Sequence, residues 1–120
     1  HRIDILQQQP AGGILSAPFD VILSNPPYIP QADRGEMLPN VLDWEPPSAL
    51  FVEDDDPVLF YRRIIDGCGT EGWLTPGGLL ALECHRDATE QVADLIPENW
   101  SGKERLRDLQ GNWRMVFARR

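Results

Sequence analysis

FDVILSNPPY, residues 19–28, is the stretch of this chain that decides its fold. Its first part, Phe19–Ser24, is almost continuously apolar, which is typical of a strand that is covered on both faces. Pro26 and Pro27 end this strand, because proline fixes φ and has no backbone N–H to donate. In an open α/β sheet, ligands bind where the carboxyl ends of parallel strands meet. The stretch therefore predicts a parallel strand that runs into a candidate binding site.

The residues that follow this strand suit a planar group bearing an NH2. The side-chain oxygen of Asn25 can accept a hydrogen bond from such a group, and Tyr28 offers a flat amphipathic face against it. Pro26 and Pro27 leave only carbonyl acceptors on the local backbone. We predict that Asn25 and Pro26 are catalytic and that residues 25–28 bind the substrate. The alternative is a plain strand-ending turn, since Asn-Pro favours turns.

Strand and helix patterns alternate along the rest of the chain. The expected strands span residues 3–6, 19–24, 79–83, 106–109 and 115–118, with a turn at 75–78 and a hairpin around 110–112. One helix is expected to begin at Asp56-Pro57 and to bury Val58, Tyr61, Ile65 and Cys68, and a second carries an apolar stripe from Ala88 to Ile96. Residues 29–50 show no period, so we interpret them as an irregular substrate-covering segment. This order predicts an α/β fold with a mainly parallel sheet and an antiparallel terminal hairpin.

Composition and charge limit the classes of function. The 120 residues suit one small domain, and the formal net charge of −8 disfavours a direct nucleic-acid partner. No apolar run is long enough for a membrane helix, so we expect no membrane association and a cytoplasmic location. The acidic run 53–56 lacks the spacing of a calcium loop, and we expect no metal site. Cys68 and Cys84 are expected to be reduced, packed thiols.

The tetrapeptide Asn25-Pro26-Pro27-Tyr28 resembles the catalytic motif of S-adenosylmethionine-dependent methyltransferases that act on amino groups. Further pairs carry the similarity along the chain and narrow it to bacterial release-factor glutamine N5-methyltransferases. These are Ile29-Pro30, Glu45-Pro46, Ala49-Leu50, Gly77-Gly78 with Glu83, and Asp108 to Gly111 with Arg114. Motif matches of this kind are hypotheses, and the downstream pairs are what favour the protein-glutamine branch.

The resemblance implies a class I, Rossmann-like methyltransferase fold, of which residues 1–120 are the C-terminal portion. It also implies the cofactor S-adenosyl-L-methionine, contacted by Asn25, and the substrate: the glutamine amide in the Gly-Gly-Gln motif of peptide-chain release factors. Glu45 is expected either to anchor the covering segment by accepting backbone N–H groups or to be a solvated turn residue. We interpret Glu83, at the end of a strand, as a structural hydrogen-bonding residue rather than a chemical one.

No Gly-rich turn follows an apolar strand in this sequence, so the cofactor loop and the N-terminal substrate-recognition domain are expected to lie outside it. Gln9 stands where the family often has an acidic residue, which leaves adenine contacts open. Two other functions remain open. One is N-methylation of a nucleobase, adenine in DNA or guanine in ribosomal RNA. The other is an inactive folding or interaction module, with dimerisation through an exposed sheet edge.

Overall fold

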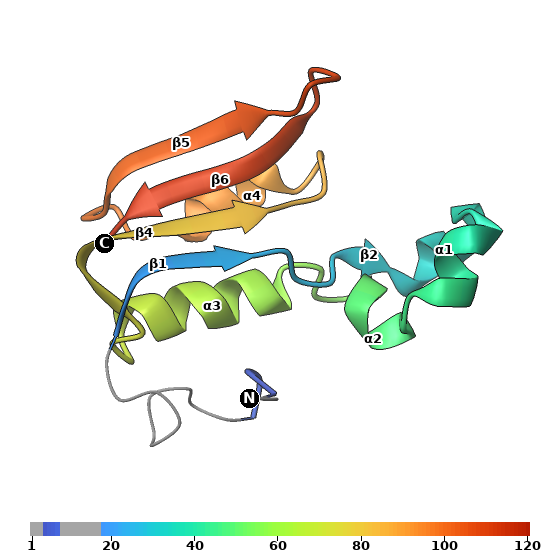
Figure 1. Cartoon of the computed structure of the whole chain (residues 1–120), viewed down its shortest axis with the longest axis horizontal. Coiled ribbons are helices and arrows are strands. Elements are labelled where there is room, and N and C mark those ends of the chain that lie inside the picture. Colours follow the sequence, from blue (N-terminus) through green and yellow to red (C-terminus); the bar gives the residue numbers. More distant parts are fainter. Residues whose placement is uncertain (1–3, 8–17) are drawn as a thin grey trace.

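A four-stranded mixed sheet with the strand order β1-β4-β6-β5 forms the centre of the computed structural model (Figure 1), which describes residues 4–7 and 18–120. Its strands are β1 Phe19–Ser24, β4 Leu74–Glu83, β5 Ser101–Arg107 and β6 Trp113–Arg119. β1 pairs with β4 in parallel, whereas β4 with β6 and β5 with β6 are antiparallel pairs. The predicted α/β class and the terminal antiparallel hairpin are confirmed, but within the described ranges the sheet has no parallel majority. The strand predicted at 106–109 is wrong: the strand is Ser101–Arg107, because the Asp108 carboxylate accepts the N–H groups of Gln110 and Asn112 and thereby forms the turn.

Two helices, α3 Leu59–Gly69 and α4 Thr89–Leu95, cover one face of this sheet and share a single core with it. The sheet contributes alternate residues, among them Leu80 and Leu82 of β4, which have no exposed surface. The helices and the residues next to them contribute the predicted stripes. Six residues are buried, namely Val58, Tyr61, Ile65, Cys68, Val92 and Ile96, and Ala88 and Leu95 pack half-buried against them. The prediction of both helical faces is therefore confirmed.

The opposite face of the sheet is open in the part of the chain that the structure describes. Val21 and Leu23 on β1 are 50% and 73% exposed, and Leu106 on β5 is 45% exposed. The prediction that Phe19–Ser24 is covered on both faces is therefore wrong for these residues. An apolar strand pattern indicates which faces are suited to burial, but the covering layer must come from elsewhere.

The predicted turn at residues 75–78 is incorporated into β4 as a bulge. The register between β1 and β4 shifts between Phe19 and Val21, and Gly77 takes up the extra length with a positive φ of 80°. The segment stays in the sheet because the Gly77 N–H donates to the carbonyl of Arg120, and the Arg120 N–H donates to Gly78. A turn sequence thus becomes the irregular first half of a central strand.

One predicted strand does not form, and one predicted helix begins later than expected. Residues Asp4–Gln7 form a turn rather than a strand, because the Asp4 carboxylate accepts the Leu6 N–H at 3.0 Å and competes with strand pairing. Ile3, Gln9 and the glycine pair 12–13 lie outside the described residues. Helix α3 begins at Leu59 instead of after Asp56, whose carboxylate pairs with Arg62 at 2.8 Å and does not cap the helix.

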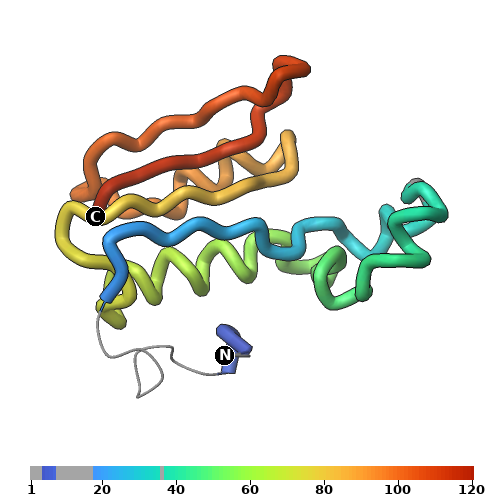
Figure 2. The backbone as a smooth tube through the Cα atoms, viewed as in Figure 1, coloured from blue at the N-terminus to red at the C-terminus, as the bar shows by residue number. Residues whose placement is uncertain are grey.

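The covering segment, residues 29–50, is built of short elements rather than being irregular. They are β2 Ile29–Pro30, the 3-10 helix η1 Gln31–Glu36, α1 Pro39–Trp44 and α2 Pro47–Leu50. Each α-helix begins with a proline at its first turn, a favourable position, but both are too short to produce a helical period in the sequence. The segment projects from one end of the molecule, away from the sheet (Figure 2).

The two ends of the covering segment are joined at a narrow neck. β2 pairs in parallel with β3 Phe51–Val52, so that Ile29 lies opposite Phe51. Both residues of β3 are buried, and the Asp54 carboxylate accepts the Ala32 N–H at 3.0 Å. The neck therefore fixes where the segment leaves and rejoins the main body.

Gly67 and Gly69 in α3 provide a matched test of the packing beneath the sheet. A Cβ on Gly67 would overlap the indole ring of Trp73, whereas a Cβ on Gly69 would lie at an ordinary contact distance of 3.7 Å from Trp100. We expect Gly67→Ala to lower the free energy of unfolding by about 1–3 kcal/mol through overpacking. Gly69→Ala should leave it unchanged or raise it by up to about 1 kcal/mol, because alanine favours the helix. Urea unfolding measures both changes, and equal effects would contradict this account of the packing.

Candidate active site

Asn25 lies directly after β1, exposed, at the boundary between two hollows. Its position follows from the parallel register, in which Ser24 is opposite Leu82 and the carboxyl ends of β1 and β4 lie side by side. Pro26 is buried, so the backbone turn after Asn25 is held in place while the amide side chain is free to reach into either hollow.

The first hollow, of about 80 Å³, is lined by the tetrapeptide and by the end of the covering segment. Asn25, Pro26 and Tyr28 form one side, and Ala49 and Leu50 of α2 form the other. The hollow is small, and a planar side-chain amide would fit it. The covering segment thus lies against the predicted substrate-binding residues.

The second hollow, of about 240 Å³, lies on the open face of the sheet at the ends of three strands. Leu23, Ala81 and Met115 give it an apolar lining, and its polar groups come from Ser24, Asn25 and Glu83. Sequence reasoning missed this hollow because its walls come from β1, β4 and β6, which are far apart along the chain. The only signal in the sequence was the position of Glu83 at the end of a strand.

The structure brings together most of the predicted site residues. Asn25, Pro26 and Tyr28 line the first hollow, and Pro27, half-buried, connects them without lining it. Glu45 does not join them: it is exposed at the end of α1, and its carboxylate accepts no hydrogen bond from the described ranges. Its anchoring role stays a prediction.

Tyr28 lies between the tetrapeptide and the residues after β4. It packs against the core beneath the sheet, and its ring centroid is 6.1 Å from that of His85. Burial raises the pKa of Tyr28, the negative charge of Glu83 adds to the rise, and the Arg114 guanidinium opposes it. Tyr28 is therefore a neutral phenol near physiological pH, which suits a packing surface rather than a base.

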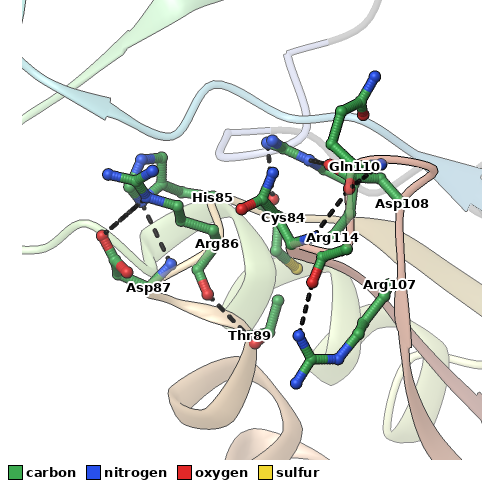
Figure 3. A network of polar contacts seen from close by, with 11 residues as sticks. Cys84, His85, Arg86, Asp87, Thr89, Arg107, Asp108, Gln110 and Arg114 are labelled. Atoms are coloured by element: carbon green, nitrogen blue, oxygen red, sulfur yellow. Dashed lines mark hydrogen bonds and ion pairs between the residues drawn. The ribbon is translucent and has the colours of Figure 1, made fainter.

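Arg114 joins the terminal hairpin to the strand ends (Figure 3). Its Nε donates to Asp108 at 3.4 Å, and its Nη1 donates to the carbonyl of Cys84 at 3.4 Å. The other oxygen of Asp108 accepts the backbone N–H groups of Gln110 and Asn112 at 3.0 and 2.9 Å. The same side chain thus orders the hairpin turn and orients the arginine.

The two cysteines are packed as predicted. Cys68 in α3 and Cys84 after β4 have no exposed surface, and burial raises the pKa of each thiol to about 12. Such thiols stay protonated near neutral pH and are poor nucleophiles. Neither cysteine lines either hollow.

Residues 4–7 and 18–120 contain no helix long and apolar enough to cross a membrane. Across the same ranges, no three His, Cys, Asp or Glu side chains come close enough together to hold a metal ion.

Comparisons with known proteins identify relatives over most of the chain. A release factor glutamine methyltransferase of Bacteroides thetaiotaomicron is 42% identical over 111 residues, which cover 92% of this chain and 39% of the relative. That of Flavobacterium psychrophilum is 38% identical over 103 residues, 85% of this chain and 35% of the relative. A bifunctional methyltransferase of Rickettsia felis is 34% identical over 117 residues, 97% of this chain and 22% of the relative. No family profile matches the chain.

These relatives are all methyltransferases, which defines the class of protein. The resemblance seen in the sequence is confirmed: most of this chain matches one part of several release factor glutamine methyltransferases at 36% to 42% identity. It spans between 22% and 39% of the length of the three relatives described.

The pairing of Asp108 with Arg114 gives a prediction about pH. Partial burial, the largest single influence, raises the pKa of Asp108, but the hydrogen bonds from Asn112, Arg114 and Gln110 together outweigh it and hold this pKa below its ordinary value of 3.8. A folded-state pKa below the unfolded value stabilises the fold at pH values above 3.8. That contribution is lost as the pH falls through the folded-state value.

We therefore expect Asp108→Asn to lower the free energy of unfolding near neutral pH and to lose this effect in strong acid. Urea unfolding of both proteins across the acid range measures the difference. The exposed Asp94, which has no ion pair or side-chain hydrogen bond in the described structure, provides the control Asp94→Asn. A difference for Asp108→Asn that stays constant with pH would contradict the role given to its charge.

Proposed function

We propose that these residues form the C-terminal part of the catalytic domain of a protein-(glutamine-N5) methyltransferase. The observation that carries the proposal is the position of Asn25, exposed at the end of a parallel strand between two hollows, one of which is also lined by the end of the covering segment. The similarity to part of each relative supports it, since the chain matches 39% of the Bacteroides protein. The substrate-recognition domain and the cofactor loop would belong to the remainder.

The complete enzyme would act in the cytoplasm on peptide-chain release factors, at the glutamine of their Gly-Gly-Gln motif. The names of the relatives specify a release factor glutamine as the methylated group. The net charge of −8 favours a protein substrate over nucleic acid, which is bound through basic surfaces. The small size of the first hollow agrees with a side-chain amide as the group that enters it.

In this mechanism the chain holds an uncharged amide in the orientation that reaction requires. The Asn25 side-chain oxygen and the Pro26 carbonyl accept the two N–H groups of the substrate amide, and Tyr28 packs on the amide plane. An amide nitrogen is a weak nucleophile because its lone pair is delocalised, so catalysis depends on orientation. The residues would thus aim the amide nitrogen at the methyl group that the cofactor would supply, and the nitrogen would release one proton to water on methylation.

S-adenosyl-L-methionine supplies the methyl group when bound. Only the apolar part of the second hollow beside Asn25 suits the methyl-bearing end of this cofactor, which leaves the Glu83 side for the substrate. The whole hollow, of about 240 Å³, is too small for the complete cofactor. The described residues offer no Gly-rich turn after an apolar strand, so the adenosine would be held by the remainder of the enzyme.

Asn25→Ala in the complete enzyme tests the orienting role. We expect turnover at saturating cofactor and release factor to fall about 10²- to 10³-fold, the usual effect of removing one oriented hydrogen-bonding group. Methylation of the release factor, followed by mass spectrometry, measures it. The exposed Asn99 provides the matched control Asn99→Ala, which should keep wild-type turnover. Near wild-type turnover of Asn25→Ala would rule out the assignment.

The isolated residues 1–120 are expected to lack both measurable affinity for S-adenosylmethionine and methyltransferase activity, because they supply only part of the cofactor site. Titration calorimetry measures the affinity, with the complete enzyme as the positive control. Tight cofactor binding by this chain alone would contradict the proposal that the rest of the enzyme supplies part of the cofactor site.

We also propose that the isolated chain dimerises through the edge of β1, which no described strand covers.

A further inference from the structure

Glu83 is the last residue of β4 and shares the second hollow with Asn25. It lies opposite Met115 on β6, on the same face of the sheet as Ala81. Both residues also line the hollow, so the carboxylate belongs to the open face and not to the core. The alternation of the strand thus directs a charged group toward the space beside the proposed reacting amide.

Glu83 is half-buried, and its carboxylate has no hydrogen bond or ion pair with residues 4–7 or 18–120. Other carboxylates that are partly buried are paired, such as Glu71 with Arg63 and Asp108 with Arg114. Arg114 is engaged by Asp108 and the Cys84 carbonyl. A partly desolvated charge with no partner is costly, which indicates that Glu83 is paired in the working enzyme.

The end of the strand that carries Glu83 is held firmly. The hydroxyl of Tyr61, in the core, donates to the Glu83 backbone carbonyl at 3.0 Å, and the preceding Leu82 is fully buried. The charge of Glu83 also raises the pKa of Tyr28, which places the carboxylate within electrostatic reach of the tetrapeptide. Glu83 is therefore a pre-positioned hydrogen-bond acceptor at the edge of the site.

We propose that Glu83 is a substrate-binding residue whose carboxylate accepts a main-chain N–H of the glycines that precede the methylated glutamine. This inference rests on the proposed function. Glycine has no Cβ, so its backbone can approach a wall of the hollow more closely than that of any other residue. A charged acceptor in an apolar surrounding forms a strong hydrogen bond with such an N–H. The carboxylate would thus select for glycine beside the reacting side chain.

The experiment uses the complete enzyme and three peptides taken from a release factor. One contains Gly-Gly-Gln, and in each of the other two a different glycine is replaced by N-methylglycine, which removes one backbone N–H. The enzymes are the wild type, Glu83→Ala, and Glu83→Gln, which keeps the volume of the side chain and guards against misfolding. Glu104→Ala is the matched control, because Glu104 is exposed and lies on the same face of the sheet through its pairing with Phe117.

For the wild type and Glu104→Ala, we expect N-methylation of one glycine to lower kcat/KM about 10- to 100-fold, the effect of losing a hydrogen bond to a charged group. Glu83→Ala should lower kcat/KM for the Gly-Gly-Gln peptide by a similar factor and be almost insensitive to N-methylation, because the two changes remove the same contact. Glu83→Gln should lie between them. Calorimetry should show the affinity for S-adenosylmethionine unchanged in every variant.

Two results would overturn the inference while leaving the proposed function in place. One is a wild-type sensitivity to N-methylation in Glu83→Ala and Glu83→Gln, and the other is a loss of cofactor affinity in either variant. A wild-type enzyme that methylates neither the peptide nor the intact release factor would instead refute the proposed function and this inference with it. The two failures are therefore distinguishable.

Discussion

The parallel pairing of β1 with β4 is the contact on which the candidate site depends. Its register sets Ser24 opposite Leu82, so Asn25 and Glu83, distant in sequence, both lie at one end of the sheet. The core beneath, with Leu80 and Leu82 fully buried, holds this register, because a slip of one residue would turn these side chains to the open face. The positions of the polar groups thus follow from the packing of apolar ones.

The sequence predicted the elements that carry their own periodic signal. Both helices of the core were found, because their apolar spacing is set by local geometry. The terminal hairpin was found from its turn residues, whereas its polar first strand, Ser101–Arg107, was missed. The strand expected at 3–6 forms a turn where the Asp4 carboxylate competes for the backbone, and the turn expected at 75–78 remains in β4 through its pairing with Arg120. In both cases a hydrogen bond that no periodic pattern describes decided the outcome. The short helices of the covering segment had too few residues to show a period.

For the candidate site, the sequence predicted residues that line the first hollow but did not predict the second hollow. Asn25 and Tyr28 were found because a strand and its terminating prolines are contiguous in the chain. The second hollow combines residues from three strands, and the register that brings Met115 beside Glu83 follows from an antiparallel pairing that a single sequence does not specify. Glu83 was interpreted as a structural residue because its carboxylate was expected to accept a hydrogen bond within the fold. No residue in the described structure donates one to this carboxylate.

The neck formed by Ile29 and Phe51 has a consequence for how this family can diversify. Because the two ends of residues 29–50 are already joined, lengthening the intervening chain adds only a small entropic cost, which grows slowly with loop length. Natural variation could therefore insert or delete residues in this region without displacing the asparagine on the other side of the junction. Under the proposed function, the length and sequence of residues 29–50 could therefore change with the substrate while the end of β1, which carries Asn25, stays the same.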